Sequence, residues 1–166
     1  MDRIAAGAVA GLAATLPMTL AMVAMHRRLP QAERYPLPPS EILLAMERRA
    51  GIEDRVGPGA HLAATLAAHF AFGALAGAGY GALPRSDRPL AAANAFGLAV
   101  WTGSYLGWVP GLRLLKPATR HPARRNALMI AAHLVWGSVL GGVTEALAGR
   151  EAPPLQGEDR ARAVAA

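Results

Sequence analysis

The 166-residue sequence contains no cysteine. Without a thiol, the chain can form no disulfide, has no thiolate nucleophile and offers no cysteine ligand to a metal. It also lacks several common catalytic motifs: there is no HExxH, no Gly-x-Ser-x-Gly, no Walker loop and no dinucleotide-binding fingerprint. We therefore expect a protein without enzymatic activity.

Charged residues are missing from four long segments, which are 4–25, 56–84, 89–112 and 126–144. About 20 helical residues cross a hydrocarbon core about 30 Å thick, so each segment is long enough to span a bilayer. A soluble bundle of amphipathic helices would instead carry charges at regular spacing within each helix. The sequence predicts an all-α polytopic membrane protein with four transmembrane helices, at about 4–25, 60–83, 90–112 and 126–148.

The distribution of basic residues predicts the orientation. Loops 26–55 and 113–125 carry eleven of the 17 Lys and Arg residues, and the positive-inside rule therefore places both loops in the cytoplasm. We expect a bacterial inner-membrane protein in contact with the lipid bilayer. The same rule accounts for the net charge of +6, so we expect no nucleic-acid partner.

The domain organisation follows from these segments. Residues 1–149 are predicted to form one transmembrane domain, and 150–166 a disordered tail of mixed charge with two adjacent prolines. Within the first loop, Ser40 is an expected N-cap and Gly51 an expected C-cap of a helix at 40–50. Its apolar residues recur at helical spacing, which favours either an amphipathic helix in the membrane interface or a lid over the bundle.

The second and fourth spans repeat one another. Ala-Ala-His-Phe-Ala-Phe-Gly at 67–73 is matched 64 residues later by Ala-Ala-His-Leu-Val-Trp-Gly at 131–137. The copies lie in the second and fourth spans, which are two crossings apart, so both copies run in the same direction across the membrane. This pattern predicts two helical hairpins related by a pseudo-two-fold axis along the membrane normal.

Glycines recur at four-residue spacing in all four spans. Such spacing clears one helix face of side chains and lets another backbone approach closely. It predicts helix-packing contacts at Gly7, Gly11, Gly73, Gly77, Gly103, Gly107, Gly137 and Gly141.

The repeat places a histidine at the same position of each span, His69 or His133, at similar depth. A histidine inside a span usually faces the bundle interior, where a partner can satisfy it. Three interpretations are open. The pair can be proton-responsive, since imidazole titrates near about pH 6.5, or it can bind a b-type haem axially. The third is a structural hydrogen bond across helices, for which the candidate partners are Thr15, Thr19, Asn94 and Thr102.

Other metal sites are not expected, because two histidines without a nearby carboxylate fall short of the four ligands of zinc. The third span is the most polar, with Asn94, Thr102, Ser104 and Tyr105. These residues can line a narrow water path or form hydrogen bonds between helices.

The glycine-rich first span with Met18, the Pro-Leu-Pro-Pro-Ser loop and the two histidine-centred spans resemble the YagU-like family of small bacterial inner-membrane proteins. The likeness covers about residues 4–149. The positions that match the family pattern are Pro38, Pro39, His69, Gly73, His133, Trp136 and Gly137. The resemblance implies a role in acid resistance and brings no catalytic residues with it.

The leading functional hypothesis is therefore an inner-membrane protein that supports tolerance of acid or envelope stress through His69 and His133. No cofactor is required by this hypothesis. The alternatives are a b-type haem protein and a small proton or solute transporter or channel, for which a homodimer would double the number of spans.

Overall fold

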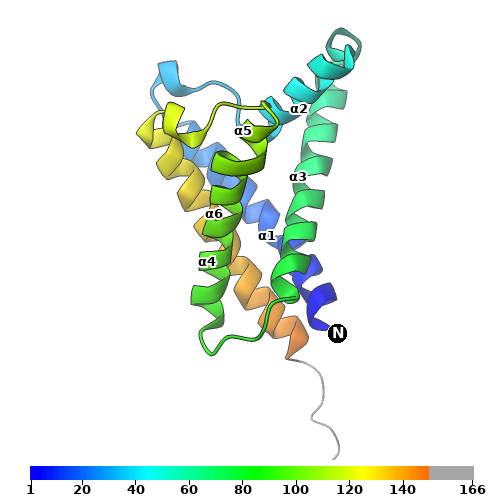
Figure 1. Cartoon of the computed structure of the whole chain (residues 1–166), viewed down its shortest axis with the longest axis vertical. Helices are drawn as coiled ribbons and strands as arrows, with labels where there is room; N and C mark the ends of the chain where they lie inside the picture. Colours follow the sequence, from blue (N-terminus) through cyan, green and yellow to red (C-terminus); the bar gives the residue numbers. More distant parts are fainter. Residues whose placement is uncertain (150–166) are drawn as a thin grey trace, which may run out of the picture.

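The computed structural model describes residues 1–149 (Figure 1). Within that range the fold is all-α, as predicted, and contains no strand. The longer helices are α1 (Arg3–His26), α2 (Pro38–Ala50), α3 (Pro58–Gly81), α4 (Pro89–Thr102) and α6 (Ala123–Ala148). Short 3-10 turns connect them at Gln31–Glu33, Glu53–Arg55 and Ala118–Arg120. The predicted tail, 150–166, lies outside the described residues.

Three helices, α1, α3 and α6, are long and apolar enough to cross a membrane. Each coincides with a predicted span, and their lengths of 24 to 26 residues exceed the roughly 20 that a bilayer needs. The prediction of a membrane protein is therefore confirmed by these three helices.

The segment predicted as a single span at 90–112 is not one α-helix. The α-helical part, α4, ends at Thr102, and a π-helical segment follows at Gly103–Trp108 before the short α5 (Val109–Gly111). Gly107 has the non-helical dihedrals φ −107° and ψ −107°. Pro110 has no N–H, and its ring clashes with the carbonyl four residues earlier, so the helix cannot continue regularly through this point.

The main helices pack in the order α3, α1, α6, α4 (Figure 1). Helix α1 packs along both α3 and α6, and α4 packs along α6, whereas α3 and α4 have few contacts. The predicted two-fold axis would relate α1 to α4 and α3 to α6, so α3 would pack against α4 as α1 packs against α6. The predicted pseudo-two-fold relation is therefore not seen in the helix arrangement, and the bundle is open between α3 and α4.

Glycines bring the backbones of α1 and α3 into contact. A Cβ atom added to Gly11 would overlap the carbonyl oxygen of Gly73, and one added to Gly77 would overlap that of Gly7. Close contacts also occur between α6 and α4, where a Cβ on Gly137 would lie 2.7 Å from the Ala93 carbonyl oxygen. Such approach requires residues without side chains.

Gly141 makes a similar contact, since its added Cβ would lie 2.8 Å from the Cβ of Ala93. The packing prediction is wrong at Gly103 and Gly107. An added Cβ at either residue would meet no described atom within 4 Å. Both lie in the π-helical segment, beyond the part of α4 that packs on α6.

Helix α2 lies across one end of the bundle, next to the start of α3 (Figure 1). It begins at Pro38 rather than at the predicted Ser40, because proline tolerates the first helical turn, where the N–H has no helical partner. The N-cap prediction for Ser40 is wrong, since its hydroxyl contacts His61 instead. Gly51 is the C-cap, as predicted, with a φ of +65° that glycine adopts readily.

Candidate functional site

A half-open pocket of about 280 Å³ occupies the space between α3 and the segment formed by α4 and its π-helical continuation. This volume is near the lower end of the range for small-molecule sites, about 300 to 1,000 Å³. The walls are mainly aromatic, aliphatic and thioether side chains, among them Met18, Met22, Phe72, Trp108, Met129 and Trp136. The lining contains no Asp, Glu, Lys or Arg.

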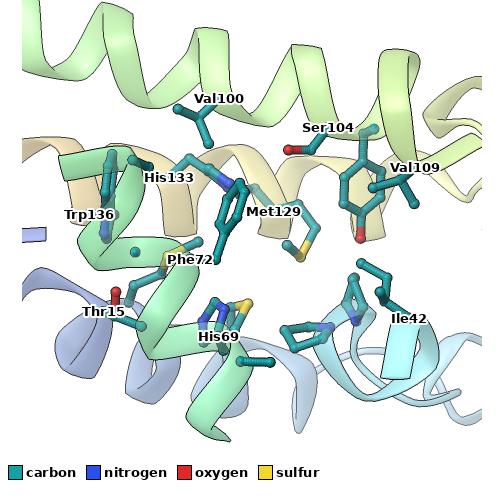
Figure 2. Close-up of a pocket in the computed structure, with 18 of the residues that line it drawn as sticks. Thr15, Ile42, His69, Phe72, Val100, Ser104, Val109, Met129, His133 and Trp136 are labelled. Carbon is teal, nitrogen blue, oxygen red and sulfur yellow. The ribbon is translucent and has the colours of Figure 1, made fainter. Parts of the chain in front are cut away.

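Both predicted histidines line this pocket, His69 from α3 and His133 from α6 (Figure 2). Each follows the start of its helix by about three turns, so at about 1.5 Å per residue they lie at similar depth, near the middle of the helices. The structure thus brings the two residues to one site. Within residues 1–149, no hydrogen bond joins one imidazole to the other.

The His133 ring is held by its own helix. Its Nδ1 lies 2.7 Å from the carbonyl oxygen of Met129, one turn earlier. A carbonyl only accepts hydrogen bonds, so the proton is on Nδ1, and Nε2 of the uncharged ring is left as an acceptor. The side chain is buried, with 8% of the residue exposed.

The Nε2 atom of His69 is buried and has no hydrogen-bond partner in the described part of the chain. The cross-helix hydrogen bond that the sequence allowed for is not formed by either histidine. Its candidate partners bond elsewhere: Thr15, Thr19 and Thr102 donate to carbonyls of their own helices, and Asn94 accepts from Ser138. A structural hydrogen bond therefore does not explain the pair.

Two further unpaired polar groups line the described pocket, the hydroxyls of Thr65 and Tyr105. Both residues are buried, at 7% and 6% exposed, and neither hydroxyl has a partner within residues 1–149. Sequence reasoning missed Thr65 as a site residue. The signal was its position four residues before His69, which places both on one face of the helix.

Unpaired buried polar groups are costly, at about 1–3 kcal/mol each. They are uncommon in folded proteins, and each needs an explanation. Here three of them, Thr65, His69 and Tyr105, line a single apolar pocket. This arrangement is typical of a ligand site, in which a few convergent polar groups orient a mostly apolar molecule.

Helix α2 forms the roof of the pocket through Pro38, Pro39, Ile42 and Met46. His61, at the start of α3, holds it in place. Its Nε2 lies 2.8 Å from the Ser40 hydroxyl and its Nδ1 2.9 Å from the carboxylate of Glu47, which is 6% exposed. Of the two roles predicted for the loop helix, the lid over the bundle is the one that these contacts match.

A buried arginine at the start of α6 joins that helix to residues 35–41, which lead into α2. Arg125, 2% exposed, donates to the carbonyls of Tyr35 and Pro36 and lies 3.2 Å from the Glu41 carboxylate. Its guanidinium also stacks 3.5 Å above the Tyr35 ring centroid. Burial raises the pKa of Glu41, and the charge of Arg125 opposes that shift by favouring the carboxylate.

The donor set does not favour a metal ion. Within residues 1–149, no group of three or more His, Asp or Glu side chains is placed to hold one. A bis-histidine haem would use Nε2 of His69, which has no partner within residues 1–149, and Nε2 of His133, whose ring bonds through Nδ1. The haem alternative stays a prediction.

The chain matches no model of a protein family, no curated protein and no solved structure. The resemblance to the YagU-like family stays a prediction from the sequence.

Proposed function

We propose that this chain is an integral membrane protein that binds an apolar ligand in the pocket between α3 and α4, and that it acts by binding rather than by catalysis. The pocket carries the proposal: it is apolar, uncharged and lined by unpaired polar atoms. Glycine contacts hold the adjoining helix pairs close together, so the opening between α3 and α4 is not the result of loose packing throughout.

The proposed membrane arrangement has four crossings. The fourth is the helical stretch 89–111, which carries no charged side chain and packs through α4 along α6. The proposed hairpins are α1 with α3 and α4 with α6. Matched glycines support them, since Gly73 contacts α1 and its counterpart Gly137 contacts α4.

Filling the pocket should abolish ligand binding. Ala67 and Ala68 are both exposed, but only Ala68 lines the pocket. An uncharged brominated lipid in the pocket should quench the fluorescence of Trp108 and Trp136, which also line it. In nanodiscs, we expect Ala68→Phe to remove this saturable quenching. Ala67→Phe is the matched control and should bind as the wild type does. Equal binding by both variants would mean that the probe does not occupy this pocket.

We also propose that the protein lies in a bacterial inner membrane with α2 and both basic loops on the cytoplasmic side. The absence of cysteine makes this directly testable by labelling. In intact spheroplasts, a membrane-impermeant maleimide should label Ser86→Cys, in the loop between α3 and α4, and leave Gln31→Cys unlabelled. Both side chains are exposed, so accessibility is matched. Labelling of Gln31→Cys alone would reverse the orientation.

A second candidate function is a response to acid through His69 and His133, supported by their meeting in one pocket without a bond between them. Protonation of either imidazole would put a charge into an apolar site, which disfavours the closed packing around it. Replacing both residues with Asn should reduce acid survival of a strain that depends on the protein, at unchanged membrane levels of the variant. Unchanged survival would remove this candidate.

A further inference from the structure

The pocket places limits on the charge of its ligand. No ionised side chain lines it, and Arg125, at the start of α6, is already bonded to two carbonyls and Glu41. A phosphate, a carboxylate or an ammonium group in the pocket would be buried without a counter-charge, which is strongly unfavourable. The ligand is therefore uncharged.

The pocket also specifies hydrogen-bonding groups. The Nε2 atom of His133 is an acceptor, because Nδ1 donates to the Met129 carbonyl. Only a ligand that donates a hydrogen bond can satisfy it. An alcohol or phenol hydroxyl is the simplest uncharged group that does so, and a ketone, ester or ether alone cannot.

The hydroxyls of Tyr105 and Thr65 can each donate to the ligand. Both line the same pocket as His133 but come from different elements, the π-helical segment and α3. A second oxygen on the ligand, such as an ester carbonyl or another ring oxygen, would accept from them. To pair with His133, Tyr105 and Thr65, a ligand therefore needs one hydrogen-bond donor and at least one acceptor, and the unpaired Nε2 of His69 can pair with either kind of group.

The side of the pocket is formed by a contact between exposed aromatic rings. Phe72 of α3 and Trp108 of the π-helical segment lie 6.1 Å apart, and they are 41% and 44% exposed. They stand where α3 and α4 do not pack, among side chains that face the lipid in the proposed membrane arrangement. A hydrocarbon chain can leave the pocket here and continue into the bilayer while the polar head stays inside.

We infer that the ligand is an uncharged lipid whose head carries a hydroxyl donor and a second oxygen, with the hydroxyl bound to His133 and the second oxygen to Tyr105 or Thr65. This rests on the proposed function, because it names the ligand class of the same pocket. Two membrane sources share this chemistry: diacylglycerol, with one hydroxyl and two ester groups, and prenyl quinols, with two ring hydroxyls.

The test compares brominated diacylglycerol with its methyl ether, in which a methyl group replaces the hydroxyl hydrogen and so removes the donor. In nanodiscs, saturable quenching of tryptophan fluorescence should require at least tenfold more ether than alcohol, since a site built to bond a hydroxyl rejects an analogue without one. A prenyl quinol, tested by competition, should displace the alcohol probe. Whichever of diacylglycerol and quinol binds more tightly identifies the source. Brominated phosphatidate should bind at least tenfold more weakly than the alcohol.

Variants connect the preference to named residues. His133→Leu should remove the discrimination between alcohol and ether, and Thr65→Val and Tyr105→Phe should each weaken binding of the alcohol several-fold while keeping part of the discrimination. Thr65→Val is nearly isosteric, so it tests the pocket even where the His133 variant does not fold.

The outcomes separate the two proposals. Equal binding of alcohol and ether, or tighter binding of phosphatidate, would overturn the hydroxyl-lipid inference and leave the proposed function standing, provided that Ala68→Phe still abolishes binding. The proposed function itself would be overturned if no probe gave saturable quenching that the Ala68→Phe substitution removes.

Discussion

Replacing Gly77 with alanine should separate α1 from α3 and destabilise the whole bundle. The new Cβ would overlap the carbonyl oxygen of Gly7 and lie 2.8 Å from the Cα of Gly11. Both are backbone atoms, so no rotamer change can relieve the overlap and the helices must move apart. Overpacking of this kind typically costs about 1–3 kcal/mol. Thermal unfolding in detergent, followed by circular dichroism, should show the loss as a clearly lower midpoint.

Gly79→Ala is the matched control for this substitution. Gly79 lies two residues away on the same helix, and a Cβ there would meet only the Phe96 ring, at an ordinary distance of 3.8 Å. The variant should be as stable as the wild type or slightly more so, because alanine favours the helix relative to glycine. Equal midpoints for the Gly77 and Gly79 variants would contradict the close contact of α1 with α3.

The glycine pattern shows how far the sequence determines the fold. Four-residue spacing predicted close packing at eight glycines, and Gly7, Gly11, Gly73 and Gly77 lie at such a contact. The same spacing at Gly103 and Gly107 leads to no contact. Spacing describes one surface of one helix, whereas packing also needs a partner at the right distance. The π-helical segment before Pro110 breaks the helix that would have carried this surface.

The candidate site was partly visible in the sequence. His69 and His133 stand out because histidine is rare in apolar spans. Tyr105 is not unusual in such spans, and Thr65 is marked only by its position four residues before His69. The role of both depends on the separation of α3 from α4, which no local pattern encodes. The N-cap prediction at Ser40 failed for a related reason: the hydroxyl found a tertiary partner, His61, that is 21 residues away.

Replacing Arg125 with methionine should be the most damaging change at the α2 end of the bundle. The arginine side chain is 3% exposed, and its loss leaves Glu41 and two carbonyls without their donor. Removing one partner of a buried ion pair costs about 3–5 kcal/mol. Because the Glu41 side chain keeps 22% of its exposure, we expect a value near the lower end. Denaturant titration should measure it, and hydrogen exchange should show faster opening of residues 35–41.

The pH dependence of this loss identifies its cause. Burial raises the pKa of Glu41 and Arg125 opposes the shift, so the variant should raise that pKa further. A carboxyl with a raised pKa binds its proton more tightly in the folded state, and its unfavourable contribution grows as pH rises through that pKa. The difference between wild type and variant should therefore shrink in acid, where Glu41 is protonated.

The neighbouring Arg124→Met is the control, since Arg124 is 70% exposed and lies 3.6 Å from Glu33, a geometry worth about 0–1 kcal/mol. It should change stability little at any pH. A loss in the Arg125 variant that has the same size at every pH would show that lost packing against the Tyr35 ring, rather than the uncompensated carboxylate, dominates at this site.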